Sequence, residues 1–282
     1  IVTRKLGTMK LRSSVMNEDM ISSAELSRAA CCNLGESFVT NPSVDVSYSD
    51  AATGAKQIKL LGLSGTYVQM LTENIPNYRG AAAPYGLGYV PGPWMQSIQV
   101  SKGTSSVKNG YEAITGQINV EFKKPQLPEA DWVSANLFAS TTNRYEANAD
   151  ATLKLSKRWS TSLLAHYENE TKAHDGNDDG FVDIPQVEQY NVWNRWAYMG
   201  DHYVFQAGIK ALSDTRTSGQ ANHGGTMHSG DLYKVGIDTE RYEFFTKNAY
   251  IFNKEKNTNL ALILSTTCLL YTSPSPRDGL LS

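Results

Sequence analysis

The sequence lacks a run of about 18 apolar residues, so it contains no candidate for a transmembrane helix. It also lacks a strong charge of either sign. The net charge of −2 gives no reason to expect nucleic acid or an anionic surface as a partner. No Ser/His/Asp arrangement, phosphate-binding loop or paired-carboxylate site is present, and we predict that the chain is not an enzyme. The remaining composition, 40% apolar and 19% charged, is globular, and the length suffices for two domains.

Neither end of the sequence resembles a natural terminus. It begins at Ile1 without a signal peptide, and we expect that a natural N-terminal segment precedes it. From Cys268 it reads Cys-Leu-Leu-Tyr-Thr-Ser-Pro-Ser-Pro-Arg-Asp, which resembles the translation of a transposon-type sequencing adapter. A natural Pro/Ser-rich tail is the alternative. We expect 268–282 to be a non-native, adapter-derived tail and the natural sequence to be cut near Thr267, within a strand.

Cysteine is also scarce, and one of the three cysteines falls in this expected tail. The other two, Cys31 and Cys32, are neighbours, and adjacent Cα atoms lie about 3.8 Å apart. This is shorter than the usual disulfide separation, so a bond between them would be strained. We interpret the pair as two small side chains packed near a helix junction. A copper-binding or redox-active pair is the alternative.

The first part of the sequence, residues 1–127, begins with helix signals. Ser22 and Glu25 form a capping box, which predicts a helix over 23–31. Asn33 and Glu36 repeat the signal and predict a second short helix. That helix must end by residue 41, because a proline disfavours helical geometry at the residue before it.

Strand signals follow in the same part. Alternating or apolar segments predict strands at 44–48, 57–63, 67–72, 98–101 and 117–120, with a Gly/Pro/Ala-rich loop at 80–93. We predict a compact mixed α/β unit over about 11–125. Its sheet should include Ile58–Leu61 and Gln117–Val120.

From about Asp131 the sequence changes to alternating segments of about ten residues. Ala147, Ala149 and Ala151 share one face, for example, and Glu146 and Asn148 share the other. We predict strands in sequential antiparallel order near 132–140, 146–156, 158–168, 192–200, 203–213, 241–253 and 259–266. So few strands cannot close a barrel, and we expect a curved open sheet.

The connections between these segments alternate in length. Those at 156–158, 200–202 and 254–257 are short, whereas 168–191 and 213–240 are long and polar. Short turns at one end and long loops at the other are typical of an outer-membrane β-barrel. Aromatic residues near strand ends suit an interfacial girdle: Trp132, Trp159, Tyr167, Trp196 and Tyr203. A soluble β-sandwich would also show alternation and is the alternative fold.

Several motifs in the first part resemble one family. Ile58–Gly65, followed by Glu73–Pro76, is similar to a strand and turn in the plug domain of TonB-dependent receptors. Three later segments resemble the signature at the end of that plug: Met95–Gly103, Asn109–Val120 and Lys123–Pro125. The resemblance covers about 11–125. The chain departs from the family in length, because it shows no TonB-contacting segment and has few barrel strands.

The resemblance implies a plug domain at 1–127 and part of a transmembrane β-barrel at 128–267. It also implies a receptor in the outer membrane of a Gram-negative bacterium, with the TonB complex and outer-membrane lipid as partners. Such a receptor takes up a scarce nutrient such as a metal complex, siderophore, haem or cobalamin. The alternative function is a secreted calcium-binding β-domain in adhesion or glycan binding.

One candidate metal site lies in the long segment 168–191. Residues 175–183 read Asp-Gly-Asn-Asp-Asp-Gly-Phe-Val-Asp, with oxygen ligands at alternate positions and a glycine at the sharp turn. This pattern is typical of a calcium loop, although Gln186 stands where an EF-hand has glutamate. We predict that Asp175, Asn177, Asp179 and Asp183 converge on Ca²⁺. An ordinary acidic turn is the alternative.

A second candidate site lies in the next long segment. His223, Met227 and His228 offer two imidazoles and a thioether, which could bind copper or contact haem. They are therefore candidate substrate contacts. A polar loop rich in Gly and His is the alternative.

Overall fold

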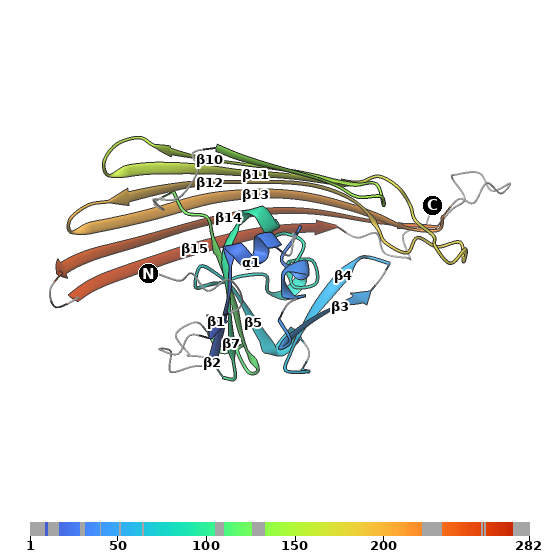
Figure 1. The fold of residues 1–282 in the computed structure, drawn as a ribbon, viewed down its shortest axis with the longest axis horizontal. Coiled ribbons are helices and arrows are strands. Elements are labelled where there is room, and N and C mark those ends of the chain that lie inside the picture. The colour runs from blue at the N-terminus through green and yellow to red at the C-terminus, as the bar shows by residue number, and fades with distance from the viewer. Residues whose placement is uncertain are drawn as a thin grey trace. The chain divides into compact units, whose positions relative to one another are not determined.

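The computed structural model describes residues 9–10, 17–28, 32–39, 41–50, 52–63, 65–104, 110–125, 133–221, 233–254, 256 and 258–272. The chain divides into two compact units, the first covering 1–50 and 54–123 and the second covering 51–53 and 124 onward (Figure 1). Within the described ranges, no helix has the length and apolar character needed to cross a membrane.

The first unit is built on a six-stranded sheet. Its strand order is β1 (Met9–Lys10), β2 (Asn17–Ser22), β7 (Met95–Lys102), β8 (Gly116–Phe122), β5 (Val68–Thr72) and β6 (Ile75–Pro76). β5 and β8 run parallel, and the other neighbours run antiparallel. Ile98, Val100, Ile118 and Val120, from the two central strands, are at most 1% exposed and form the core. The predicted mixed α/β unit is therefore confirmed.

The two predicted helices of this unit have different outcomes. α1 spans Ser23–Arg28 and buries Leu26, and the end of that predicted helix, residues 29–31, lies outside the described residues. The second predicted helix is a single 3-10 turn, η1 (Gly35–Phe38). Its capping signal is real, because the side chain of Asn33 accepts a hydrogen bond from the backbone N–H of Glu36, and Glu36 accepts one from the N–H of Cys32. Pro42 follows too soon for a longer helix to form.

One prediction about this sheet is wrong. β4 (Ala55–Leu60) pairs with β3 (Val44–Asp50) in a separate two-stranded sheet, so Ile58–Leu61 does not lie in the sheet that contains Gln117–Val120. Leu61 and Gly62 both adopt positive φ, 55° and 82°, which turns the chain sharply after Leu60. The 3-10 turn η2 (Gly65–Tyr67) then leads into β5. This irregular stretch separates the two sheets.

The first unit also contains the irregular segment that was predicted as a loop. The predicted loop at 80–93 contains two 3-10 turns, η3 (Gly80–Ala82) and η4 (Gly92–Trp94), and leads directly into β7. Trp94, Tyr89 and Val90 are at most 1% exposed, so the end of this segment is packed in the core and does not lie on the surface. Cys32 is also buried, 7% exposed, as expected for a packing residue.

The second unit is a curved seven-stranded antiparallel sheet whose strands follow one another in sequence order (Figure 1). The strands are β9 (Val133–Ala139), β10 (Arg144–Lys154), β11 (Trp159–Glu170), β12 (Gln186–Met199), β13 (Tyr203–Gly219), β14 (Lys234–Asn253) and β15 (Thr258–Thr272). Within the described part of the chain, β9 and β15 are each paired along one side. The predicted order and open sheet are confirmed, and Trp132 lies outside the described residues.

Several strands run farther than predicted. β13 continues to Gly219 and β14 starts at Lys234, so much of the expected loop at 213–240 is a paired ladder. β-branched residues such as Thr215, Thr217 and Thr239 favour this extension. β15 also continues to Thr272, because Cys268–Thr272 pairs in register with Asp238–Tyr242. This pairing does not bear on the origin of residues 268–282, and their non-native origin stays a prediction.

Candidate functional site

The two faces of the long sheet have opposite chemistry. One face exposes large apolar side chains; Leu163, Ile209 and Leu262 are 45%, 62% and 55% exposed. The other face buries polar and charged side chains: Glu146, Asn148, His166, Glu168, Gln189, Asn191, Arg195, Lys210, Asp214, Arg216 and Arg241. A soluble sandwich buries its apolar face, so this arrangement is that of a barrel wall with lipid outside and a polar lumen inside.

Aromatic residues border the apolar face at two levels. At the short-turn end, Trp159 lies opposite Tyr198, with ring centroids 5.0 Å apart, and Tyr203 lies opposite Tyr250. Toward the long-loop end, Tyr167 lies opposite Tyr190, with centroids 4.9 Å apart. Eight residue steps separate Trp159 from Tyr167, which is about 26 Å along the strand at about 3.3 Å per step. Tilted strands of this length match the apolar band of an outer-membrane barrel.

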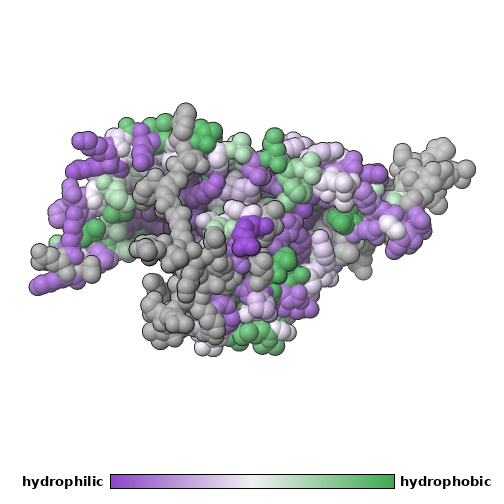
Figure 2. Space-filling model, viewed as in Figure 1, coloured by the Kyte–Doolittle hydropathy of each residue, from purple (hydrophilic) through white to green (hydrophobic). Residues whose placement is uncertain are grey.

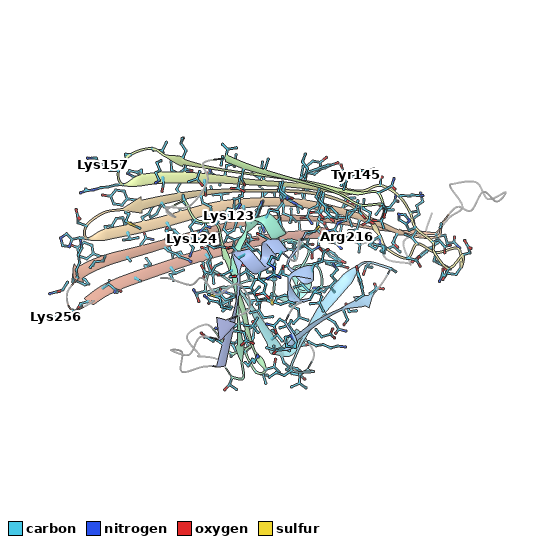
Figure 3. All side chains as sticks on the ribbon, viewed as in Figure 1. Lys123, Lys124, Tyr145, Lys157, Arg216 and Lys256 are labelled. Atoms are coloured by element: carbon cyan, nitrogen blue, oxygen red, sulfur yellow. The ribbon has the colours of Figure 1, made fainter. Side chains whose placement is uncertain are left out.

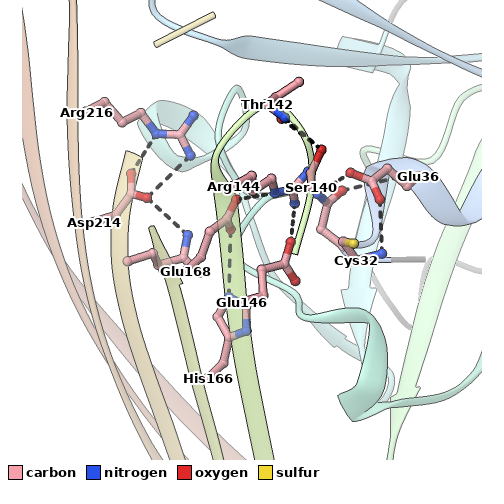
Figure 4. Close-up of polar contacts among 12 residues, drawn as sticks. Cys32, Glu36, Ser140, Thr142, Arg144, Glu146, His166, Glu168, Asp214 and Arg216 are labelled. Carbon is pink, nitrogen blue, oxygen red and sulfur yellow. Dashed lines mark hydrogen bonds and ion pairs between the residues drawn. The ribbon is translucent and has the colours of Figure 1, made fainter. Parts of the chain in front are cut away.

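Charged side chains on the polar face form paired clusters (Figure 4). Arg144 bridges two carboxylates, with Nη2 2.7 Å from Glu146 and Nε 2.9 Å from Glu168. His166 lies between Asn148, 2.8 Å from its Nδ1, and Glu168, 3.8 Å from its Nε2. These five residues come from β10 and β11, because adjacent antiparallel strands bring alternate residues onto one face.

Similar clusters continue on the neighbouring strands. Asp214 accepts hydrogen bonds from Arg216, 2.7 Å, and from the side-chain amide of Gln189, 3.0 Å. On β14, Arg241 donates to Glu243 at 2.8 Å. The pairs neutralise charges that burial would otherwise penalise. Together they make a polar wall of hydrogen-bond donors and acceptors, interrupted by the buried apolar side chains of Leu164, Trp193 and Leu212 on the same face.

The first unit contains a pocket of about 440 Å³, lined by residues of β4, β5 and the segment 78–87. Ile58, Val68 and Leu87 supply apolar walls. Arg79 and Glu112 add a charged pair, with Nε donating to Oε1 at 2.9 Å. This hydrogen bond raises the pKa of the Arg79 guanidinium above its ordinary value, so the group stays charged. The volume lies in the range of small-molecule sites.

The loop 175–183 lies at the end of the sheet opposite the short turns. The backbone N–H of Val182 donates to the carbonyl oxygen of Gly219, and the N–H of Ala221 donates to that of Gly180. These bonds hold the loop against the tip of β13. Asp178 and Gly180 adopt positive φ, 58° and 84°, at the sharp turn.

The side-chain oxygen atoms of this loop accept hydrogen bonds from groups of the loop itself. Asp175 accepts hydrogen bonds from the N–H groups of Asp179 and Gly180, at 3.2 and 2.7 Å. Asp183 accepts one from the N–H of Gly176 at 2.6 Å, and Asn177 donates to Asp179 at 3.0 Å. Across the described ranges, no three His, Cys, Asp or Glu side chains gather as a metal-binding group. The calcium site therefore stays a prediction.

The remaining candidate residues were either not described by the structure or not identified from the sequence. His223, Met227 and His228 lie outside the described residues, and their role as substrate contacts also stays a prediction. Sequence reasoning missed Arg79 and Glu112, which are 33 residues apart and carry no motif of their own. It also noted Glu146 and Asn148 only as the polar half of an alternating strand. That alternation was the signal that could have identified the buried polar face.

Comparison with known proteins assigns the first unit. Residues 10–117 match the TonB-dependent receptor plug domain. No curated protein sequence matches the chain.

Solved structures match both units. The alcaligin outer-membrane receptor FauA of Bordetella pertussis superposes with a TM-score of 0.71 at 12% identity, over 95% of this chain and 42% of that one. The siderophore receptor PiuA of Acinetobacter baumannii gives 0.66 at 13%, over 95% and 38%. The copper transporter OprC gives 0.58 at 12%, over 95% and 47%. The chain thus spans less than half of each receptor. Residues 10–117 therefore match a TonB-dependent receptor plug domain, and the sheet that follows has the fold of the start of an outer-membrane receptor barrel.

Proposed function

We propose that the complete protein is an outer-membrane receptor that imports a scarce nutrient with energy supplied by the TonB complex. The observation that carries the proposal is a plug domain joined to a sheet with an apolar outer face and a polar inner face. A metal complex, siderophore, haem or cobalamin is the class of ligand. The similar solved structures include an alcaligin receptor, a siderophore receptor and a copper transporter, which supports this range.

The chemistry of the polar wall favours binding of a hydrophilic ligand over binding of an apolar one. Its buried cations and carboxylates already pair with one another, as in the Arg216–Asp214 pair. A ligand with both donors and acceptors can exchange hydrogen bonds with such pairs without leaving a charge unpaired. Metal chelates and cobalamin have this mixed character.

Uptake measurements test the proposal. We expect cells that lack the gene to lose accumulation of one radiolabelled nutrient from a panel of ferric siderophores, copper, haem and cobalamin. A strain that retains the gene but lacks TonB should show the same loss, because the energy source is missing. Restoring the complete gene should restore uptake in the first strain only. Accumulation that persists without TonB would contradict the proposal.

The alternative function, a secreted calcium-binding β-domain in adhesion or glycan binding, makes a different prediction. Such a domain fractionates with the secreted proteins, whereas a barrel sediments with the outer membrane and shows heat-modifiable gel mobility. The exposed apolar side chains between the two aromatic levels, such as Leu163 and Ile209, favour the membrane.

We also propose that the loop 175–183 binds Ca²⁺ at the outer end of the receptor. Each of its carboxylate oxygens has a lone pair beyond the hydrogen bonds described above, so a cation can be added without removing them. Four aspartates within nine residues also repel one another, and a cation relieves this repulsion. Extracellular calcium modules bind in the range of about 0.1–1 mM.

Isothermal titration of the complete receptor checks the calcium prediction. We expect binding in this range for the wild type and a loss of at least about tenfold in affinity for Asp179→Ala. Asp201→Ala, which removes an aspartate at the opposite end of the sheet, is the matched control and should bind like the wild type. Equal binding by the Asp179→Ala and wild-type receptors would show that the loop is only an acidic turn.

A further inference from the structure

The short-turn end of the sheet carries a concentration of positive charge. Four cations lie on its three turns, Lys157, Arg158, Lys254 and Lys256, and a fifth, Lys154, ends β10 beside the first turn. We call this group the basic rim. The same turn segments contain two acidic residues, Asp201 and Glu255, so the sequence there has a net charge of +3. Figure 3 shows Lys157 and Lys256 at the same end of the sheet.

The opposite end of the sheet has the opposite sign. The loop 171–185 carries four aspartates and a single cation, Lys172. On the outer face of the extended strands, three carboxylates, Glu188, Asp238 and Glu240, and one cation, Lys234, are exposed. The chain is therefore polarised, and the basic rim is a property of one end rather than of the surface in general.

The cations of the basic rim are accessible and in excess over their partners. Arg158 and Lys254 share one carboxylate, Asp201, at 3.0 and 3.7 Å, and their side chains remain 56% and 59% exposed. Within the part of the chain that the structure describes, Lys157 and Lys256 have no carboxylate partner. Hydrophilic residues gather at this end in Figure 2, where the turns of Figure 1 lie. Such charges are available to an anionic surface.

The basic rim borders the aromatic level that marks the edge of the apolar band. Arg158 precedes Trp159 directly, Lys157 lies two residues before it, and Lys254 lies two residues after Phe252. Two residue steps are about 7 Å. The polar headgroup layer on each side of a bilayer is about 5–7 Å thick. Flexible lysine stems therefore place their ammonium groups within the headgroup layer.

We propose that the basic rim binds anionic phospholipid headgroups in the inner leaflet of the outer membrane. Short turns face the periplasm in barrels of this type, so the rim meets the phospholipid leaflet. Aromatic side chains fix the depth of the sheet in the membrane, and the cations on their periplasmic side bind the negatively charged phosphates. The proposal rests on the membrane placement of the sheet and is independent of which nutrient is transported.

Quenching of tryptophan fluorescence by brominated lipids tests the proposal, because Trp159 lies beside the rim. The complete receptor is reconstituted in phosphatidylcholine, and brominated phosphatidylglycerol is titrated against brominated phosphatidylcholine. We expect the wild type to prefer phosphatidylglycerol. Lys157→Gln/Lys256→Gln should reduce this preference about tenfold, and high salt should abolish it in the wild type.

A matched control removes two lysines from the other end. Lys172→Gln/Lys234→Gln changes the net charge equally, and this variant should keep the wild-type preference. Equal loss in both variants, or no preference in the wild type, would overturn the proposal. Loss of binding to purified cell-wall sacculi by the rim variant, with its lipid preference unchanged, would assign the rim to peptidoglycan instead. Nutrient uptake by the rim variant should be normal, which separates this test from that of the transport proposal.

Discussion

Leu163→Arg is expected to destabilise the folded receptor in lipid by about 2–4 kcal/mol. Leu163 lies on the exposed apolar face, four residues from Trp159 and four from Tyr167, at the middle of the band between the two aromatic levels. A guanidinium there faces hydrocarbon and must distort the bilayer to reach water. In a soluble protein, the same substitution at a half-exposed site costs about 0.5 kcal/mol or less.

Leu155→Arg is the matched control for this substitution. Leu155 is 50% exposed, against 45% for Leu163, but it lies in the short turn and its N–H donates to the carbonyl oxygen of Trp159. At this interfacial level the cost should fall to about 0–1 kcal/mol. Reversible unfolding of the complete receptor in lipid vesicles, with heat-modifiable mobility as a check of folding, measures both. Equal costs for the two substitutions would contradict the membrane placement.

The barrel strands could be predicted because their side-chain period is two and their register follows from it. Leu163 and His166 fall on opposite faces simply by counting, and the structure places them so. Strand ends were harder to predict. The ladder of β13 and β14 extends to Gly219 and Lys234 through residues with polar side chains on both faces. Polarity alone resembles a loop, whereas the pairing of two extended segments depends on their partner strand.

The plug could be recognised from its motifs, but its internal arrangement could not be read from them. Ile58 and Ile118 both lie in apolar strands, and the sequence does not say which strands are neighbours. The positive φ values of Leu61 and Gly62 decide this, since they turn the chain out of β4 before β5 begins. Leucine in this conformation is uncommon, so propensity alone would not predict it.

The candidate sites show the same limit. Lys56, Arg79 and Glu112 line one pocket, although they come from three separate segments of the sequence. Their meeting depends on the parallel pairing of β5 with β8, a long-range contact without a local signal. The loop 175–183 could be predicted as a calcium site because its pattern is local, and that site stays a prediction. A site formed by neighbouring residues can be predicted from one sequence, whereas a site formed by residues from distant segments can be found only when the fold is known.

Gly116→Val is expected to unfold the plug, with a destabilisation of about 3–5 kcal/mol. Gly116 is the first residue of β8 and lies between β7 and β5, opposite Lys102 on one side and Val68 on the other. Its φ of 153° is one that residues with a side chain rarely adopt. A Cβ atom at this position would overlap the backbone carbonyl oxygen of Ser101 and the side chain of Leu60. Neither can move away easily, because both belong to buried parts of the plug.

Limited trypsin digestion of the complete receptor measures this effect, because the plug offers Lys102 and Lys123 as cleavage sites once it unfolds. We expect rapid cleavage of the plug in Gly116→Val, while the barrel keeps its heat-modifiable mobility. Gly236→Val is the control. Gly236 lies in β14, where a Cβ atom would meet no other atom within 4 Å, and it should tolerate the change. A plug that resists trypsin equally in both variants would show that β7 and β8 can separate at Gly116, contrary to their close pairing.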